Sequence, residues 1–189
     1  MRPKRPTTVS VSRKYEGTRI SLRVDTARFD DGLEFAREIV EHPGSVVLVP
    51  ITAAGKVLLV RQYRQSAEKV LLEAPAGTIE SGESPEATAR RELQEEVGYK
   101  AGKLIPIGGS WVAPGYSTEY SHVYIAMELE PASLPADEGE DIVVAEFEFS
   151  DIHRLIIEGE LEDQMSIAAL LSAQHVYMDN IKTGSGEAN

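Results

Sequence analysis

The 189-residue chain contains no cysteine, and this absence excludes several kinds of chemistry. It rules out disulfides, a thiol nucleophile, iron–sulfur clusters and zinc held by thiolates. Long apolar runs are missing too: none reaches the roughly 18 residues that a membrane span requires. No apolar stretch follows the basic start as in a secretory signal. We therefore expect a cytoplasmic protein of about one domain that has no membrane partner.

Basic side chains are in deficit, with 19 lysines and arginines against 31 aspartates and glutamates and a formal net charge of −12. Nucleic-acid binders carry the opposite balance, so no nucleic-acid partner is expected. The acidic surplus suits the binding of hard cations. It would repel an anionic substrate unless metal ions or local arginines neutralise the charge.

The hydrophobic pattern predicts an α+β protein in which strands precede and follow one central helix. Alternating or β-branched runs predict strands at 9–12, 19–25, 33–40, 45–51, 56–63 and 70–73, and again at 104–108, 122–128 and 142–149. Two further helices are expected at about 150–157 and 162–178. The polar segment 182–189 is typical of a disordered tail.

The central helix is predicted over residues 85–97. Ser84 is a suitable N-cap, Pro85 suits the first helical position, and Gly98 stands where a C-terminal glycine cap belongs. An apolar stripe recurs every four residues, formed by Ala89, Leu93 and Val97.

The same helix carries three glutamates at i, i+3 and i+4, namely Glu92, Glu95 and Glu96. They share one side of the helix, where like charges repel each other. A bound divalent cation offsets this repulsion, because clustered carboxylates are the ligands that Mg²⁺ and Mn²⁺ prefer. The alternative is a solvated acidic face that Arg90 and Arg91 partly compensate.

The residues around this helix resemble the Nudix box, G-x5-E-x7-R-E-U-x-E-E-x-G-U, in which U is a bulky apolar residue. Every fixed position is matched, by Gly77, Glu83, Arg91, Glu92, Glu95, Glu96 and Gly98. Leu93 takes the first U position and Tyr99 the last, where an aliphatic residue is more typical. The resemblance implies a Nudix α/β/α sandwich with a mixed sheet.

The resemblance also implies a role for each box residue. The family's metal ligands match Glu92, Glu96 and the backbone carbonyl of Ala76. Glu95 matches a further carboxylate of the catalytic centre, and Glu83 and Arg91 match the pair that orients the helix and its carboxylates. The implied cofactor is Mg²⁺, with Mn²⁺ as an alternative, which activates water and neutralises a diphosphate.

Sequence outside the box resembles the ADP-ribose pyrophosphatase branch of this family. The similarity covers residues 37–44, 60–64 and 72–77, and a Pro-Gly-x-Ser-x-Glu loop that begins at Pro114. It implies a nucleoside diphosphate sugar as substrate, with candidate binding residues Arg37, Arg61, Arg64, Glu73 and Glu119. Strand alternation places Arg61 and Arg64 on opposite faces, and we favour Arg64. The alternative for each residue is a surface salt bridge.

An acidic loop at 137–141 resembles the one that supplies the catalytic base in this branch. Glu138 is the first candidate and Glu140 the second, and the alternative is an acidic turn before a strand. The branch further implies a homodimer in which residues 1–42 form an antiparallel strand segment, followed by a Nudix domain over 43–181. Trp111, the only tryptophan, is expected in the core or at an interface, with pocket lining as the alternative.

The function that this resemblance implies is Mg²⁺-dependent hydrolysis of ADP-ribose to AMP and ribose 5-phosphate. A different sugar nucleotide, such as GDP-mannose or ADP-glucose, is the alternative within the same chemistry. A non-catalytic ligand sensor with the Nudix fold is the alternative outside it. Isopentenyl diphosphate isomerase relies on a cysteine, so the absence of cysteine argues against it.

Overall fold

The computed structural model describes residues 3–135, 139 and 141–184, and in the last helix the side chains up to residue 177. The chain divides into two compact units. Unit 1 comprises Met1–Gly44 and Trp111–Tyr120, and unit 2 comprises Ser45–Ser110 and Ser121–Asn189. Among the helices that the structure describes, none is both long and apolar enough to span a bilayer.

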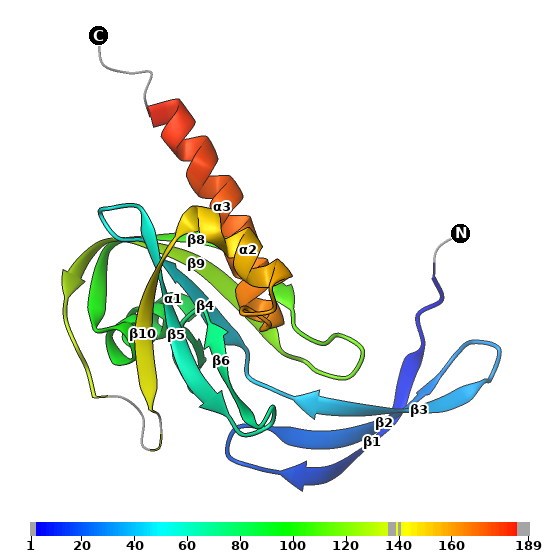
Figure 1. Ribbon diagram of the computed structural model, residues 1–189. Helices are drawn as coiled ribbons and strands as arrows, with labels where there is room; N and C mark the ends of the chain where they lie inside the picture. The colour runs from blue at the N-terminus through cyan, green and yellow to red at the C-terminus, as the bar shows by residue number, and fades with distance from the viewer. Residues whose placement is uncertain (1–2, 136–138, 140, 185–189) are drawn as a thin grey trace. The chain divides into compact units, whose positions relative to one another are not determined.

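Unit 1 is built on an antiparallel sheet of three strands, β1 (Thr7–Glu16), β2 (Ser21–Arg28) and β3 (Glu34–Glu41), with β2 in the middle (Figure 1). Every residue of β1 is exposed. The guanidinium of Arg23 on β2 contacts Asp25 at 3.0 Å and Glu41 at 2.5 Å. Polar pairs therefore hold this sheet, which buries little apolar surface within the chain.

A loop of unit 1 is fixed to the end of β3. Val40 N–H donates to the carbonyl of Tyr116 at 2.7 Å, and Thr118 N–H donates to the carbonyl of Val40 at 2.9 Å. Thr118 Oγ1 also accepts a hydrogen bond from the N–H of His42. The loop that begins at Pro114 is therefore anchored to β3 through backbone groups.

Unit 2 contains two sheets. The first has the order β7-β4-β9-β8, with β4 antiparallel to β7 and parallel to β9, and the second is antiparallel with the order β10-β5-β6. Their strands are β4 (Ser45–Pro50), β5 (Lys56–Arg64), β6 (Lys69–Glu73), β7 (Ala76–Thr78), β8 (Tyr99–Trp111), β9 (Tyr120–Pro131) and β10 (Ile142–Glu148). The first sheet is therefore mixed.

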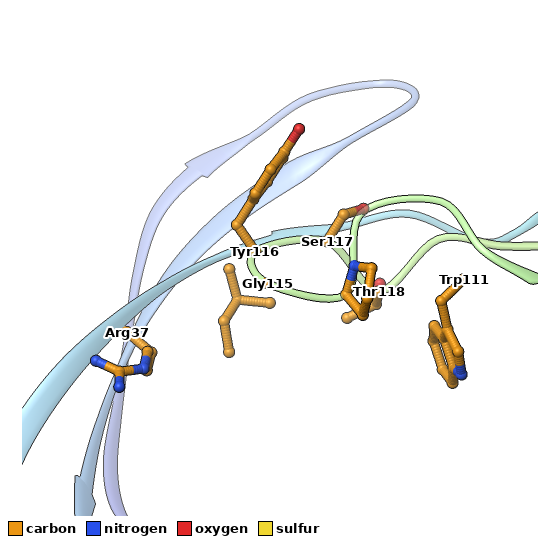
Figure 2. A pocket seen from close by; sticks show the side chains of 8 residues that line it. Arg37, Trp111, Gly115, Tyr116, Ser117 and Thr118 are labelled. Atoms are coloured by element: carbon orange, nitrogen blue, oxygen red, sulfur yellow. The ribbon is translucent and has the colours of Figure 1, made fainter. Parts of the chain in front are cut away.

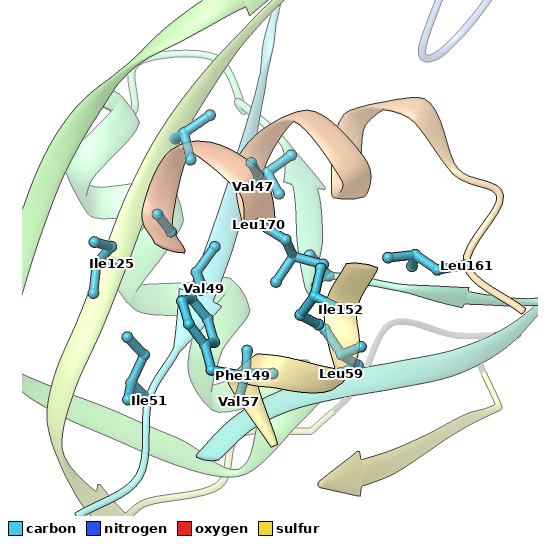
Figure 3. Packing of buried hydrophobic residues seen from close by; sticks show 14 of the residues in the cluster. Val47, Val49, Ile51, Val57, Leu59, Ile125, Phe149, Ile152, Leu161 and Leu170 are labelled. Atoms are coloured by element: carbon cyan, nitrogen blue, oxygen red, sulfur yellow. The ribbon is translucent and has the colours of Figure 1, made fainter. Parts of the chain in front are cut away.

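All six residues of β4 are buried, and its alternate side chains enter two hydrophobic clusters. On one side Val47 and Val49 pack with Phe149, Ile152 and Leu170, as Figure 3 shows. On the other side Val46 and Leu48 pack with the apolar stripe of the central helix, namely Ala89, Leu93 and Val97. A strand buried on both faces is the middle of three layers. The predicted α/β/α sandwich is confirmed.

The central helix begins and ends as predicted. Ser84 caps α1 (Pro85–Glu92) by accepting a hydrogen bond from the N–H of Ala87. The helix continues as a wide π-helical turn, η1 (Leu93–Val97), and ends at Gly98, whose φ of 77° is left-handed. The wide turn was not predicted, and it contains two of the three clustered glutamates.

Some elements differ from the predicted ranges. The short strand β7 was missed because Ala76-Gly77-Thr78 has little strand propensity, and its strand geometry comes from pairing with β4. β8 is longer than 104–108, since an edge strand tolerates Pro106 and Gly108 within it. Helix α2 (Ile152–Ile157) follows a short 3₁₀ turn, η2 (Phe149–Asp151), and α3 (Gln164–Gly184) extends into the segment 182–189 predicted as a disordered tail.

Two adjacent leucines of α3 test the packing of the first cluster. Leu170 is 0% exposed and Leu171 is 42% exposed. We expect Leu170→Ala to lower the free energy of unfolding by about 2–5 kcal/mol, because it leaves a cavity against β4. Leu171→Ala should change it by less than about 1 kcal/mol. Urea denaturation of both variants checks this, and equal losses would contradict the packing described here.

Candidate active site

The glutamate cluster lies where α1 passes into η1. Glu92 is the last residue of α1, and Glu95 and Glu96 belong to the wide turn. Glu92 is 8% exposed and Glu96 is 7% exposed, although both are acidic. Charged groups this far removed from water require compensating charges or hydrogen bonds. Arg91 and the backbone N–H of Ala76 supply this compensation.

Arg91 is the cation among these carboxylates. Its Nη1 donates to Glu92 Oε1 at 2.7 Å and to Glu95 Oε2 at 2.8 Å, and its Nε donates to Glu83 Oε1 at 3.1 Å. The hydrogen bond to Glu83 is the main cause that raises the pKa of Arg91. One guanidinium therefore joins the loop before α1 to two of the clustered glutamates.

Glu83 is itself fixed on several sides. Arg91 is the main cause that lowers the pKa of Glu83 from 4.5 to about 2, and the hydroxyl of Thr88 adds to the shift by donating to Oε2 at 2.8 Å. Thr88 is fully buried inside α1 and was not predicted as part of the site. The only sequence signal for it is a polar side chain beside the apolar stripe of the helix.

Gly77 on β7 leaves room for the carboxylate of Glu92. A Cβ at this position would lie 1.8 Å from Glu92 Oε1 and 1.9 Å from its Cδ. Any larger residue would displace the Glu92 side chain. The first glycine of the box therefore has a steric role, since it lets a glutamate lie directly against the backbone.

Glu96 is held by the same short strand. The N–H of Ala76 donates to Glu96 Oε2 at 2.9 Å. Ala76 thus contacts the cluster through its backbone, and its carbonyl is the group that the resemblance assigns to metal binding. The structure brings Ala76, Glu92, Glu95, Glu96 and Arg91 together.

The donor set fits a divalent cation, because three carboxylates and a carbonyl supply hard oxygen ligands. Within the part of the chain that the structure describes, no three acidic or imidazole groups are arranged as a metal site. In the structure Arg91 donates to oxygens of Glu92 and Glu95, and the N–H of Ala76 donates to an oxygen of Glu96.

Arg64 and Glu73 form a bidentate pair between β5 and β6. Arg64 Nε donates to Glu73 Oε1 at 2.9 Å, and Nη2 donates to Oε2 at 2.6 Å. The pKa of Arg64 is raised mainly by Glu73, with smaller contributions from Glu96 and Asp163. Arg64 is therefore electrostatically coupled to the cluster. Arg61 points to the exposed face of β5, opposite to Gln62, as strand alternation predicts.

Arg37 and Glu119, the two other residues predicted to bind substrate, belong to unit 1. There a pocket of about 420 Å³ is lined by Arg37, Ile39, Trp111 and residues 114–118 (Figure 2). Figure 2 shows Arg37 and Trp111 at opposite ends of this group. Trp111 is 57% exposed and contacts Tyr120 edge to face, so it lines a pocket and is not a core residue. Glu119 Oε1 lies 3.9 Å from His42 Nδ1.

Glu138 and Glu140, the two predicted candidates for the catalytic base, lie outside the residues that the structure describes. Sequence reasoning also missed Asp163 and Ser166, at the start of α3. Asp163 accepts hydrogen bonds from both the N–H and the hydroxyl of Ser166. The available signal was an aspartate three residues before a serine at a helix start, which is typical of an N-cap.

Known proteins resemble this chain in sequence and in fold. A family model described as NUDIX domain matches residues 41–170. An ADP-ribose pyrophosphatase of Bacillus subtilis (strain 168) is 37% identical over 165 residues, covering 86% of this chain and 89% of that protein. A GDP-mannose pyrophosphatase of Yersinia pestis (strain Pestoides F) is 33% identical over 141 residues, covering 69% of this chain and 70% of that protein. The crystal structure of an ADP compounds hydrolase has the same fold, with a TM-score of 0.82, 24% identity and coverage of 100% of both chains.

The depressed pKa of Glu83 predicts how stability depends on pH. Its folded-state pKa of about 2 lies below its ordinary value of 4.5, so its pairing with Arg91 stabilises the fold above pH 4.5. This contribution is lost as the pH falls towards the folded-state value. Glu83→Gln should therefore show a flatter dependence of the free energy of unfolding between about pH 5 and pH 3 than the wild type.

Urea denaturation at a series of pH values measures this slope. Glu86→Gln is the matched control, because Glu86 is an exposed carboxylate on the same helix that pairs with Arg90. It should keep the wild-type slope. A wild-type slope in Glu83→Gln as well would show that the Arg91 pair does not control acid stability.

Proposed function

This chain belongs to the NUDIX domain family, and from that premise we propose that it is a metal-dependent hydrolase that splits ADP-ribose into AMP and ribose 5-phosphate. The observation that carries the proposal is the carboxylate cluster on α1 and η1, organised by Arg91 and Gly77. The name of the Bacillus subtilis relative supports the choice of ADP-ribose. The cytoplasmic location stays a prediction.

In this proposal Glu92, Glu96 and the carbonyl of Ala76 hold Mg²⁺, and Mn²⁺ can replace it. The bound ion supplies Lewis acidity and a water of lowered pKa. Arg91 would orient Glu92 and Glu95 beside the ion, and Glu83 would hold the guanidinium in place. Because the guanidinium of Arg91 is a rigid fork, it orients the carboxylates that it contacts.

The remaining residues act on the substrate. We assign Arg64 to a phosphate oxygen, since Glu73 takes two of its three guanidinium nitrogens and fixes its direction. Arg61 is the weaker candidate because it lies on the opposite face of β5. Glu138, or Glu140 as second choice, takes the proton of the attacking water.

The pocket of unit 1 offers an aromatic surface at Trp111 and a cation at Arg37, together with a largely apolar lining. These groups suit a purine base and an anionic phosphate of the same nucleotide. We assign recognition of the nucleoside to this pocket, with Glu119 beside it for a ribose hydroxyl.

The exposed strand β1 supports the proposal of a homodimer formed through residues 1–42, since an unpaired edge strand is a surface for pairing.

A second substrate is supported by one observation. The Yersinia pestis relative is named GDP-mannose pyrophosphatase and matches over about the same length of both proteins. Both substrates present a diphosphate to the box, and only the base and the sugar differ. GDP-mannose is therefore the comparison that a test of the substrate has to include.

Product analysis tests the proposed reaction. The protein is incubated with ADP-ribose or GDP-mannose in the presence of Mg²⁺, Mn²⁺ or EDTA, and the products are separated by chromatography. We expect AMP and ribose 5-phosphate from ADP-ribose, no product in EDTA, and a loss of at least about 100-fold in kcat for Glu96→Gln. Glu86→Gln on the exposed side of the helix should keep wild-type rates. Hydrolysis of GDP-mannose alone would show that GDP-mannose, and not ADP-ribose, is the substrate. No hydrolysis of either compound would contradict the proposed function.

The role of the unit 1 pocket is tested by Trp111→Ala. Loss of the aromatic surface should raise KM for ADP-ribose by about 5–150-fold, because base stacking is worth about 1–3 kcal/mol. The kcat should change less, since the box is untouched. Ile157→Ala removes an exposed apolar side chain of α2 and should leave KM unchanged. If KM is the same in both variants, the pocket does not recognise the base.

A further inference from the structure

A buried chain of hydrogen bonds ties the start of α3 to the segment that leads into β7. The N–H of Ala74 donates to Ser166 Oγ at 2.8 Å, and Ser166 Oγ donates to Asp163 Oδ2 at 2.6 Å. The same Oδ2 accepts from the N–H of Ser166 at 2.8 Å. Ala74 and Ser166 are each 1% exposed, so water has no access to replace the hydroxyl.

The segment Ala74–Ala76 is short, and hydrogen bonds engage the N–H of Ala74, the carbonyl of Pro75 and the N–H of Ala76. Pro75 has no N–H, and its carbonyl accepts from Leu48 N–H on β4 at 2.8 Å. The next N–H, that of Ala76, donates to Glu96 Oε2. The N–H of Ala74, which donates to Ser166, and the N–H of Ala76, which donates to Glu96, are therefore two residues apart on a segment with little freedom to adjust.

Asp163 is also coupled to the site through charge. It contributes, after Glu73 and Glu96, to raising the pKa of Arg64. The carboxylate that orients Ser166 thus lies within electrostatic reach of the arginine that is also coupled to Glu96. No box residue belongs to α3. Its start is nevertheless connected to the site in two ways, by the hydrogen bond from Ala74 to the Ser166 hydroxyl and by the charge of Asp163 near Arg64.

We propose that Ser166, oriented by Asp163, is a positioning residue that sets the place of the Glu96 carboxylate through the segment Ala74–Ala76. Without the hydroxyl, a buried N–H of Ala74 has lost its acceptor, and such a donor is costly to leave unpaired. The segment shifts to find another acceptor, and the Ala76 N–H moves with it. This inference rests on the proposed function, in which Glu96 is a metal ligand.

Ser166→Ala tests the inference, with Ser121→Ala as its control. Ser121 on β9 is 2% exposed, and its Oγ has no hydrogen-bond partner among the residues described, so the control removes an equally buried hydroxyl that positions nothing. Mn²⁺ is titrated into metal-free, full-length protein without substrate, and free Mn²⁺ is measured by electron paramagnetic resonance. We expect Mn²⁺ affinity about tenfold weaker in Ser166→Ala and unchanged in Ser121→Ala.

Three further measurements separate positioning from simple destabilisation. With ADP-ribose and saturating Mg²⁺, Ser166→Ala should lower kcat and leave KM nearly unchanged, because the nucleoside contacts are intact. Melting temperatures of both variants show whether stability alone has changed. Asp163→Asn keeps an acceptor for Ser166 and should keep most of the Mn²⁺ affinity, whereas Asp163→Ala should resemble Ser166→Ala.

Wild-type Mn²⁺ affinity and kcat in Ser166→Ala, with only a lower melting temperature, would overturn the inference. If Ser166→Ala does not fold, the two Asp163 variants decide: unequal Mn²⁺ affinities support the relay, and equal affinities overturn it. A wild-type protein that binds no Mn²⁺ and hydrolyses no sugar nucleotide removes the proposed function and the inference with it. Failure of the inference appears only in the variants, whereas failure of the proposed function appears already in the wild-type protein, so the two are distinguishable.

Discussion

Carboxylates brought within one helical turn and largely removed from water repel one another unless a cation lies among them. In this chain Arg91 supplies that cation, with hydrogen bonds to Glu83, Glu92 and Glu95. Its position also ties the loop before α1 to the end of the helix. Because the guanidinium is a rigid fork, it fixes directions as well as charge. The rest of the site depends on this arrangement.

The scaffold makes that arrangement stiff. Strand β4 is buried on both faces, so α1 on one side and α3 on the other pack against the same six residues. The short strand β7 pairs with β4 and presents Gly77 to Glu92 and Ala76 to Glu96. The same hydrophobic core therefore positions the carboxylates from two directions. A shift of α1 or α3 would therefore move β4 or β7, and with them the glutamate carboxylates.

Much of the fold could be predicted from the sequence, because its signals are local. Ser84, Pro85 and Gly98 mark the ends of the central helix, and the apolar stripe marks its buried face. The α+β class followed from these patterns, whereas the sandwich with a mixed sheet was implied by the resemblance to the Nudix box. Strand β7 and the wide turn η1 were missed because both depend on tertiary partners and not on propensity. The end of α3 was missed because polar residues at a helix terminus resemble a tail.

The site was predicted less evenly, for a physical reason. The box residues lie at fixed spacings on β7, the loop before α1 and the helix, and helical geometry brings Glu92, Glu95 and Glu96 to one side. The Arg64–Glu73 pair, the Thr88 hydroxyl and the Ser166 relay join residues through folding, and single-sequence spacing contains no trace of such contacts. Glu138 and Glu140 stay predictions.

The division between box and pocket explains why the reaction class is easier to assign than the substrate. The groups assigned to the diphosphate are carried by α1, η1 and β7, which are fixed by the core of unit 2. The groups assigned to the nucleoside are carried by β3 and a loop of unit 1, where the side chains of Arg37 and Trp111 are exposed although the loop backbone is anchored to β3. Substitutions in that loop change recognition without disturbing the core. In the proposed function, one carboxylate cluster therefore acts on the diphosphate that ADP-ribose and GDP-mannose share, and residues such as Arg37 and Trp111 are assigned the choice between the two.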